Sequence, residues 1–171
     1  FLSKPTIAKV NGSSYGGGVG LVACCDIAIG AEGAKFSLSE VKLGLVPAVI
    51  SPYVIAAIGP RHARRYFLSA EVFGAEEARR IGLLHETVPG GELDAAVARV
   101  LHWLLKGGPA AQREAKQLVQ KQTGMTPSAQ TLADRRNARL IARLRVSEEG
   151  QEGLAAFLDK RPPHWSRGGE S

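Results

Sequence analysis

The chain has 171 residues, of which 44% are hydrophobic and 22% charged, and its 22 lysines and arginines exceed its 16 aspartates and glutamates. This length and balance fit one globular domain with its own core, and they exclude a disordered tail, a collagen-like chain and a membrane-spanning helix, which needs roughly 20 apolar residues. The positive charge favours anionic partners such as nucleic acid, anionic lipid or phosphate-bearing small molecules, unless it only solvates the surface.

The chain begins with residues that match no secretory signal peptide, Phe1 to Lys4, and it begins without Met. A lysine–proline step then leads directly into an expected strand at residues 6–10, so we expect the chain to be a piece of a longer one. The only cysteines, Cys24 and Cys25, are adjacent in an apolar run. We expect them to be buried, reduced thiols of a cytoplasmic protein, because disulfides persist mainly outside the cytosol.

The first 90 residues predict short strands and helices. Continuous apolar runs, typical of strands buried on both faces, predict strands at residues 6–10, 26–29, 35–37 and 85–88. Helices are expected at residues 16–25 and 75–81, and two more begin at Ser51-Pro52, where Ser51 is the cap, and at Pro60. Residues 40–47 form a turn-rich segment between them.

The remaining residues predict helices only. Amphipathic patterns place helices at residues 93–105, 110–122 and 129–146. Ser147 followed by Glu148 and Glu149 predicts the start of a last helix that runs to Lys160, because a hydroxyl cap and acids in the first turn both stabilise a helix N-terminus. The tail to Ser171 is expected to be mobile.

A glycine-rich stretch follows the first expected strand and carries no charge before Asp26. Because glycine has no Cβ, such a stretch lets backbone N–H groups approach a ligand closely, and the following helix end favours negative charge. Three interpretations fit. Residues 18–23 match a dinucleotide fingerprint with Glu40 as its acid, residues 16–18 allow close helix–strand packing, and the same amides form an oxyanion hole for a thioester.

Motifs spread over nearly the whole chain form one pattern, at residues 4–12, 16–18, 25–29, 35–40, 43–47, 75–83, 149–153 and 160–161. This pattern resembles the crotonase superfamily of enoyl-CoA hydratases and isomerases. The resemblance implies an α/β fold, a spiral of ββα turns with a C-terminal helical trimerisation region. Residues 1–90 then form the C-terminal part of the spiral core and residues 91–171 the trimerisation region. The family's N-terminal ββα units, which supply the first oxyanion N–H and much of the CoA groove, precede the part matched here.

The resemblance also implies the roles of the site residues. The Gly17 N–H matches the second oxyanion donor, and Glu40 matches the later of two glutamates that hydratases often carry, so it is expected to act as acid and base. The earlier glutamate corresponds to Gly20, which has no carboxylate. Further substrate contacts are implied for Gly16, Gly18, Gly20, Pro47, Ala48, Phe157, which flanks the adenine, and Lys160, which meets the CoA phosphates.

No metal is expected, since the four histidines show no ligand spacing, and no separate cofactor, since CoA arrives with the substrate. Residues 18–22, 47–53 and 64–68 are together similar to methylglutaconyl-CoA and isohexenylglutaconyl-CoA hydratases. Their substrates are branched and carboxylated, and Arg61, Arg64 and Arg65 are candidates to pair with that carboxylate or with CoA phosphates.

The resemblance therefore implies hydration of an α,β-unsaturated, branched or carboxylated acyl-CoA by a homotrimer or hexamer. The alternatives are a Δ3,Δ2-enoyl-CoA isomerase, which needs only the later acid, an RNA-binding member of the family, and a catalytically silent member. RNA binding is less expected, because the basic residues are not interleaved with aromatic ones. No membrane partner is expected.

Overall fold

A computed structural model describes residues 1–166 of the chain. The strands are β1 (Ile7–Val10), β2 (Ser14–Tyr15), β3 (Ile27–Ala31), β4 (Lys35–Ser37), β5 (Phe73–Gly74) and β6 (Glu86–Val88). The α-helices are α1 (Gly17–Cys24), α2 (Ser51–Ser69), α3 (Ala75–Arg80), α4 (Leu93–Leu104), α5 (Pro109–Gln122), α6 (Pro127–Arg145) and α7 (Glu148–Leu158). Short 3-10 helices form η1 (Ser39–Leu43), η2 (Gly90–Glu92) and η3 (His164–Ser166).

Two small sheets organise the first half of the chain. One has the order β1-β3-β6 with all strands parallel, and Ile7 of β1 lies opposite Ile27 of β3. The other has the order β2-β4-β5, with β2 and β4 parallel and β4 and β5 antiparallel. The second sheet places the end of β4 beside the N-terminus of α1, which follows β2 directly, since the Gly16 N–H donates to the Ser37 carbonyl.

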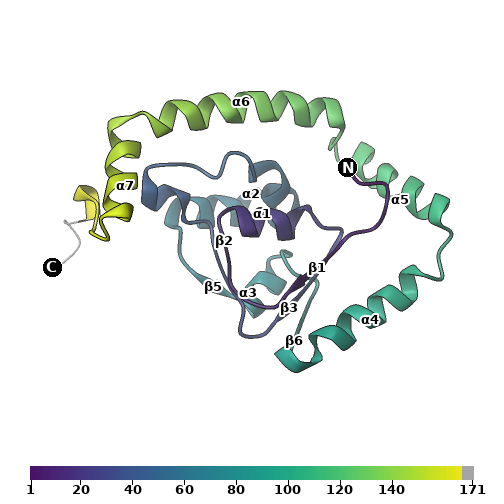
Figure 1. The fold of residues 1–171 in the computed structure, drawn as a ribbon. Helices are drawn as coiled ribbons and strands as arrows, with labels where there is room; N and C mark the ends of the chain where they lie inside the picture. Colours follow the sequence, from purple (N-terminus) through teal and green to yellow (C-terminus); the bar gives the residue numbers. More distant parts are fainter. Residues whose placement is uncertain (167–171) are drawn as a thin grey trace.

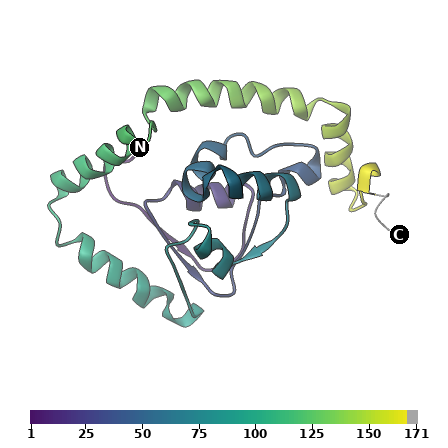
Figure 2. The ribbon, with the colours of Figure 1, turned by 180° about the vertical axis from the view of Figure 1, so that it is seen from behind.

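The helices divide into those that cover the strands and those that surround them. Helices α1 and α2 pack against each other beside the strands, whereas α4, α5 and α6 form an arc around this compact part (Figure 1). The same arc is visible from behind, with α7 at its end (Figure 2). Within residues 1–166, no helix combines the length and hydropathy needed to cross a bilayer.

The main core lies between β4, β5 and α2. Phe36, Leu38, Val54 and Tyr66 are fully buried, and the rings of Phe36 and Phe73 stack with centroids 5.7 Å apart. A smaller cluster of buried apolar residues attaches α4 to β3 and β6: Ile29, Val88, Leu93 and Ala96. The core therefore fixes the segment between β4 and α2, which includes η1.

Several expected elements are confirmed within a residue or two. Pro60 does begin a new helical segment, because Gly59 interrupts α2 with φ 73° and ψ 162°. Ser147 caps α7, its hydroxyl accepting the Gly150 N–H at 3.1 Å. The two-residue strands β2 and β5 are too short to produce a recognisable pattern and were not expected.

Three expectations need correction or lie outside the described residues. Ser51 does not cap α2, because its hydroxyl donates to the Ala48 carbonyl at 2.8 Å and Ile50 occupies the cap position. Cys24 and Cys25 are free thiols as expected, but Cys24 is exposed and Cys25 half-buried, since the apolar run ends at the C-terminus of α1. Of the tail expected to be mobile, residues 167–171 lie outside the described part.

Helix α7 packs unusually closely against η1. A Cβ on Gly153 would lie 2.9 Å from the Leu43 Cα and closer still to the Leu43 carbonyl, and a Cβ on Gly44 would lie 2.5 Å from the Glu149 carbonyl oxygen. Gly44 also has φ 66°, a left-handed conformation that favours glycine. The closing helix is thus pressed onto the segment that carries Glu40.

We expect Gly153→Ala to lower the free energy of unfolding by about 1–3 kcal/mol, because the new methyl group meets backbone atoms that cannot rotate away. Urea unfolding followed by circular dichroism measures this change. Gly91→Ala is the control, since a Cβ there meets nothing within 4 Å. An equal effect of the two substitutions would contradict the close contact between α7 and η1.

Candidate functional site

The glycine-rich stretch forms a sharp turn at the start of α1. Gly16 has φ 50° and ψ −118°, and its N–H donates to the Ser37 carbonyl at 2.9 Å. Gly17 is the first residue of α1, where the N–H has no acceptor within the helix, and the space around its Cα is open. The start of α1 therefore presents a backbone amide at the positive end of a helix, beside open space where a Gly17 side chain would lie.

Glu40 lies against this turn. Its Oε1 is 3.1 Å from the position that a Cβ on Gly16 would take, so the missing side chain makes room for the carboxyl. Its Oε2 is buried and has no hydrogen-bond partner among the described residues. Burial in these surroundings raises the pKa of the Glu40 carboxyl above its ordinary value. The arrangement presents an acid–base group next to an amide donor.

The two groups that the sequence analysis singled out, Gly17 and Glu40, are therefore neighbours, because Glu40 contacts the residue that precedes Gly17. The dinucleotide interpretation finds no such support. The fingerprint residues 18–23 lie inside α1 rather than at the strand-to-helix turn that a pyrophosphate requires.

The other glycines of the turn serve different purposes. A Cβ on Gly18 would make ordinary contact with the Ser14 Cβ at 3.5 Å. A Cβ on Gly20 would lie 2.7 Å from the Ile50 Cβ and closer still to its Cγ2. Glycine is thus required at position 20 by packing against Ile50, a contact that the sequence analysis did not identify.

Pro47 and Ala48 are buried in the segment between η1 and α2. The Ala48 carbonyl accepts hydrogen bonds from the Ser51 hydroxyl at 2.8 Å and from the Asn137 side-chain amide of α6 at 2.6 Å. These bonds fix the segment that leads to Ile50. The Asn137 hydrogen bond thereby attaches α6, one of the outer helices, to the segment beside the site.

Phe157 and Lys160 lie near the end of α7, and both side chains are exposed in this chain. Lys160 has φ 53°. The residues of α7 that pack toward η1 are Gly150 and Gly153, nearer its start. The expected contacts of Phe157 and Lys160 with adenine and phosphates remain predictions.

The expected arginines form a separate feature on α2. A cavity of about 540 Å³ is lined by Arg61, His62, Arg64 and Arg65, and Arg65 pairs with Glu71 at 2.6 Å. None of these lining residues belongs to the glycine turn. Their expected pairing with a substrate carboxylate or a phosphate remains a prediction.

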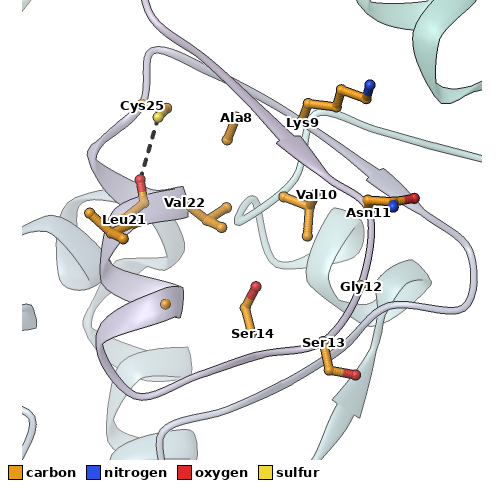
Figure 3. Close-up of a pocket in the computed structure, with 11 residues that line it drawn as sticks. Ala8, Lys9, Val10, Asn11, Gly12, Ser13, Ser14, Leu21, Val22 and Cys25 are labelled. Carbon is orange, nitrogen blue, oxygen red and sulfur yellow. Dashed lines mark hydrogen bonds between the residues drawn. The ribbon is translucent and has the colours of Figure 1, made fainter.

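A second hollow, of about 410 Å³, abuts the glycine turn at Gly18 (Figure 3). Residues 8–14, from β1 and the loop after it, form one wall, and one face of α1 with Leu21, Val22 and Cys25 forms the other. Strand β1 pairs only with β3 in the described sheet, so its other edge borders this space. The hollow offers an approach to the start of α1 between a strand edge and a helix.

Sequence reasoning missed Ile50, Gly44 and Gly153 as residues that shape the site. Gly44 and Gly153 lie within the segments that carry the resemblance. Glycine at these two positions could have indicated that two backbones approach each other closely. No sequence signal paired Ile50 with Gly20, because that contact joins residues 30 positions apart through the fold.

Comparison with known proteins adds an independent finding. A model of the enoyl-CoA hydratase/isomerase family matches residues 2–168. The chain is 36% identical to a crotonyl-CoA hydratase of Syntrophomonas wolfei, a match covering 94% of this chain and 61% of the relative. It is 31% identical to a 2,3-dehydroadipyl-CoA hydratase of Escherichia coli, a match that covers 94% of this chain and 62% of the relative.

The structure superposes on the crystal structure of a carnitinyl-CoA hydratase from Mycobacterium avium with a TM-score of 0.86 and 32% identity. That match covers 96% of this chain and 64% of the other, so the two share the crotonase fold over the described region. The chain spans about three fifths of the length of the relatives it matches.

We expect Glu40→Gln to change how stability depends on pH. Because the folded-state pKa of Glu40 is raised, the folded protein holds more protons than the unfolded one between the ordinary and the raised pKa. The free energy of unfolding therefore falls as pH rises through this window, and the neutral amide removes that fall. Urea unfolding from pH 4 to 8 measures the difference.

Glu32→Gln is the control, since the Glu32 side chain is exposed. Two results would contradict the burial of an unpartnered carboxyl. One is a Glu40→Gln variant with the same pH dependence of stability as the unmodified protein. The other is a Glu40→Gln variant that is less stable than the unmodified protein at neutral pH.

Proposed function

The chain belongs to the enoyl-CoA hydratase/isomerase family, and from this premise we propose that it serves in the hydration of an α,β-unsaturated acyl-CoA. The observation that carries the proposal is the unpartnered, buried oxygen of Glu40 beside the turn that opens at the Gly17 amide. A carboxyl and an amide in this relation can act on opposite parts of one small acyl group.

The reaction follows from these two groups. The Gly17 N–H donates to the thioester carbonyl oxygen and stabilises the negative charge that develops there. Ionised Glu40 takes a proton from water as the water oxygen bonds to Cβ, and the electron pair of the double bond moves toward the carbonyl. Protonated Glu40 then gives that proton to Cα, so the elements of one water molecule are added across the double bond.

A raised pKa suits Glu40 for this exchange. A general acid–base group works best when its pKa lies near the operating pH, because both protonation states are then accessible. Burial displaces the pKa of Glu40 in that direction. No second carboxyl is needed if the same group accepts and returns the proton.

The finer substrate assignment is also our proposal: the acyl group is branched or carboxylated. The similarity of residues 18–22, 47–53 and 64–68 to hydratases of such substrates supports it. The Escherichia coli relative acts on 2,3-dehydroadipyl-CoA, an acyl-CoA with a second carboxyl group, which shows that related chains use carboxylated substrates. The cationic cavity on α2 offers side chains that attract such a group.

We further propose that the outer helices contact other copies of the chain in a trimer or hexamer. Large apolar side chains of this arc face water in the single chain. They are 57–84% exposed and comprise Trp103, Leu105, Leu118 and Leu132. Gathering these side chains in an interface would bury them. The cytoplasmic location expected from the sequence stays a prediction.

The second candidate is a double-bond isomerase, favoured by Gly20, which contributes no carboxylate. An isomerase moves one proton between carbons and leaves a conjugated thioester unhydrated. Crotonyl-CoA separates the two activities: a hydratase removes the absorbance of the conjugated thioester, and an isomerase leaves it unchanged.

The oxyanion role of Gly17 is testable by replacing its N–H with the ring N–Cδ of proline. Proline is tolerated at the first position of a helix, where Gly17 lies. We expect Gly17→Pro to lower kcat on crotonyl-CoA by roughly 10²–10³-fold, the usual loss for one oxyanion donor. Loss of absorbance in a stopped-flow assay measures the rate.

Gly17→Ala is the matched control, because it keeps the amide and its Cβ enters open space. We expect Gly17→Ala to stay within a few-fold of the unmodified protein. Equal activity of the proline and alanine variants would exclude the Gly17 amide as a donor to the reacting carbonyl.

A further inference from the structure

Two side chains lie against glycines that are one turn apart at the start of α1. Gly16 and Gly20 are joined by a backbone hydrogen bond, with the Gly20 N–H donating to the Gly16 carbonyl at 3.3 Å. The Glu40 carboxyl lies over Gly16, and the Ile50 side chain lies over Gly20. One turn of an α-helix rises about 5.4 Å, so the Glu40 carboxyl and the sec-butyl side chain of Ile50 lie against positions about that far apart along the helix.

Ile50 closes this face completely at the level of Gly20. Even the smallest side chain at position 20 would lie 2.7 Å from the Ile50 Cβ, well inside van der Waals contact. The wall at Gly20 is therefore hydrocarbon contributed by Ile50, a residue of a different segment. A polar group placed there would lose its water without gaining a partner.

The fold holds Ile50 in place. Its carbonyl accepts the Val54 N–H at 3.0 Å, which starts α2, and the preceding Ala48 carbonyl is fixed by Ser51 and Asn137. Because the backbone on both sides is hydrogen-bonded, the Ile50 Cα and Cβ hold a fixed position beside α1. Fixed walls discriminate between substrates that differ by one carbon.

An acyl group bound as the proposed function requires would reach this wall. With its carbonyl at the Gly17 amide, a substituent on Cβ is three carbon–carbon bonds from the carbonyl carbon, a reach of about 4 Å, which is comparable to one helical turn. With Glu40 serving Cα and the water at Cβ, an acyl chain that runs along α1 from Gly17 brings its Cβ substituent to the level of Gly20. The Ile50 hydrocarbon is the group that lies there.

We propose, resting on the proposed function, that Ile50 is a specificity-determining residue that favours acyl thioesters with a hydrocarbon branch on Cβ. The branch packs against the Ile50 side chain one turn beyond the oxyanion amide. This narrows the substrate class: a charged substituent of the acyl group points away from this wall.

The test compares the kcat/KM ratio of 3-methylcrotonyl-CoA to crotonyl-CoA, substrates that differ by one methyl group on Cβ. Ile50→Val and Ile50→Thr supply nearly isosteric side chains that differ by a hydroxyl. We expect the ratio to fall about tenfold from the valine to the threonine variant, because one methyl contact in an apolar pocket is worth roughly 10–200-fold. Val49→Thr, at an adjacent side chain that is 56% exposed, is the control and leaves the ratio unchanged.

An equal ratio in Ile50→Val, Ile50→Thr and the unmodified protein overturns the inference while the proposed function stands. Absence of turnover and of binding for both thioesters in the unmodified protein overturns the proposed function instead.

The packing itself has a readout that needs no substrate. Gly20→Ala should lower the unfolding midpoint in urea, and Ile50→Gly should restore most of the loss in the double variant, whereas Ile50→Ala should not, since its Cβ remains 2.7 Å away. If the stability changes of Gly20→Ala and Ile50→Gly simply added in the double variant, the contact on which the inference rests would be overturned.

Discussion

A buried carboxyl oxygen that has no hydrogen-bond partner within residues 1–166 is the constraint on which this site depends. Burying a polar group unpaired costs free energy, about 1–3 kcal/mol by mutational measures, so a fold retains one only where other contacts hold it in place. Glu40 is held by η1, which lies between the core strand β4 and helix α2 and is pressed from outside by α7. The unpaired oxygen leaves the carboxyl free to take up or give a proton, as the proposed reaction requires.

Glycine enables these contacts at several points, each for a different physical reason. Gly16 adopts a left-handed conformation and leaves room for the Glu40 carboxyl. Gly20 admits Ile50, and Gly44 and Gly153 let two backbones approach each other. The glycine-rich stretch therefore leaves open space at residue 17, as the proposed oxyanion role requires, and is closed by packing at residue 20.

Local signals in the sequence were enough to predict most elements. Pro60 after Gly59 and the Ser147 cap followed by acids placed helix boundaries where the structure has them. The turn at Gly16–Gly18 and the proximity of Glu40 to it followed from the resemblance of the motifs rather than from composition or periodicity. Nearly the whole chain carried that resemblance, and the family match covers residues 2–168.

Contacts between distant segments were not predictable in the same way. Ser51 looked like a helix cap, but its hydroxyl bonds to Ala48 because the tertiary fold turns the preceding segment toward it. The contact of Ile50 with Gly20 and that of Leu43 with Gly153 depend on how helices cross, which a single sequence does not encode as a local pattern. The exposure of Cys24 depends likewise on where α1 ends.

The central claim is that Glu40 is a desolvated acid which meets the acyl thioester bound at the glycine turn. Its most direct test is the titration of the Glu40 carboxyl by ¹³C NMR, assigned with Glu40→Gln, in the presence and absence of acetoacetyl-CoA as an unreactive thioester. The account predicts a pKa above the ordinary range of glutamate and a change of the Glu40 signal on binding. A Glu40 carboxyl with the pKa of an exposed glutamate, and with a signal that does not change when the thioester is added, would contradict the account.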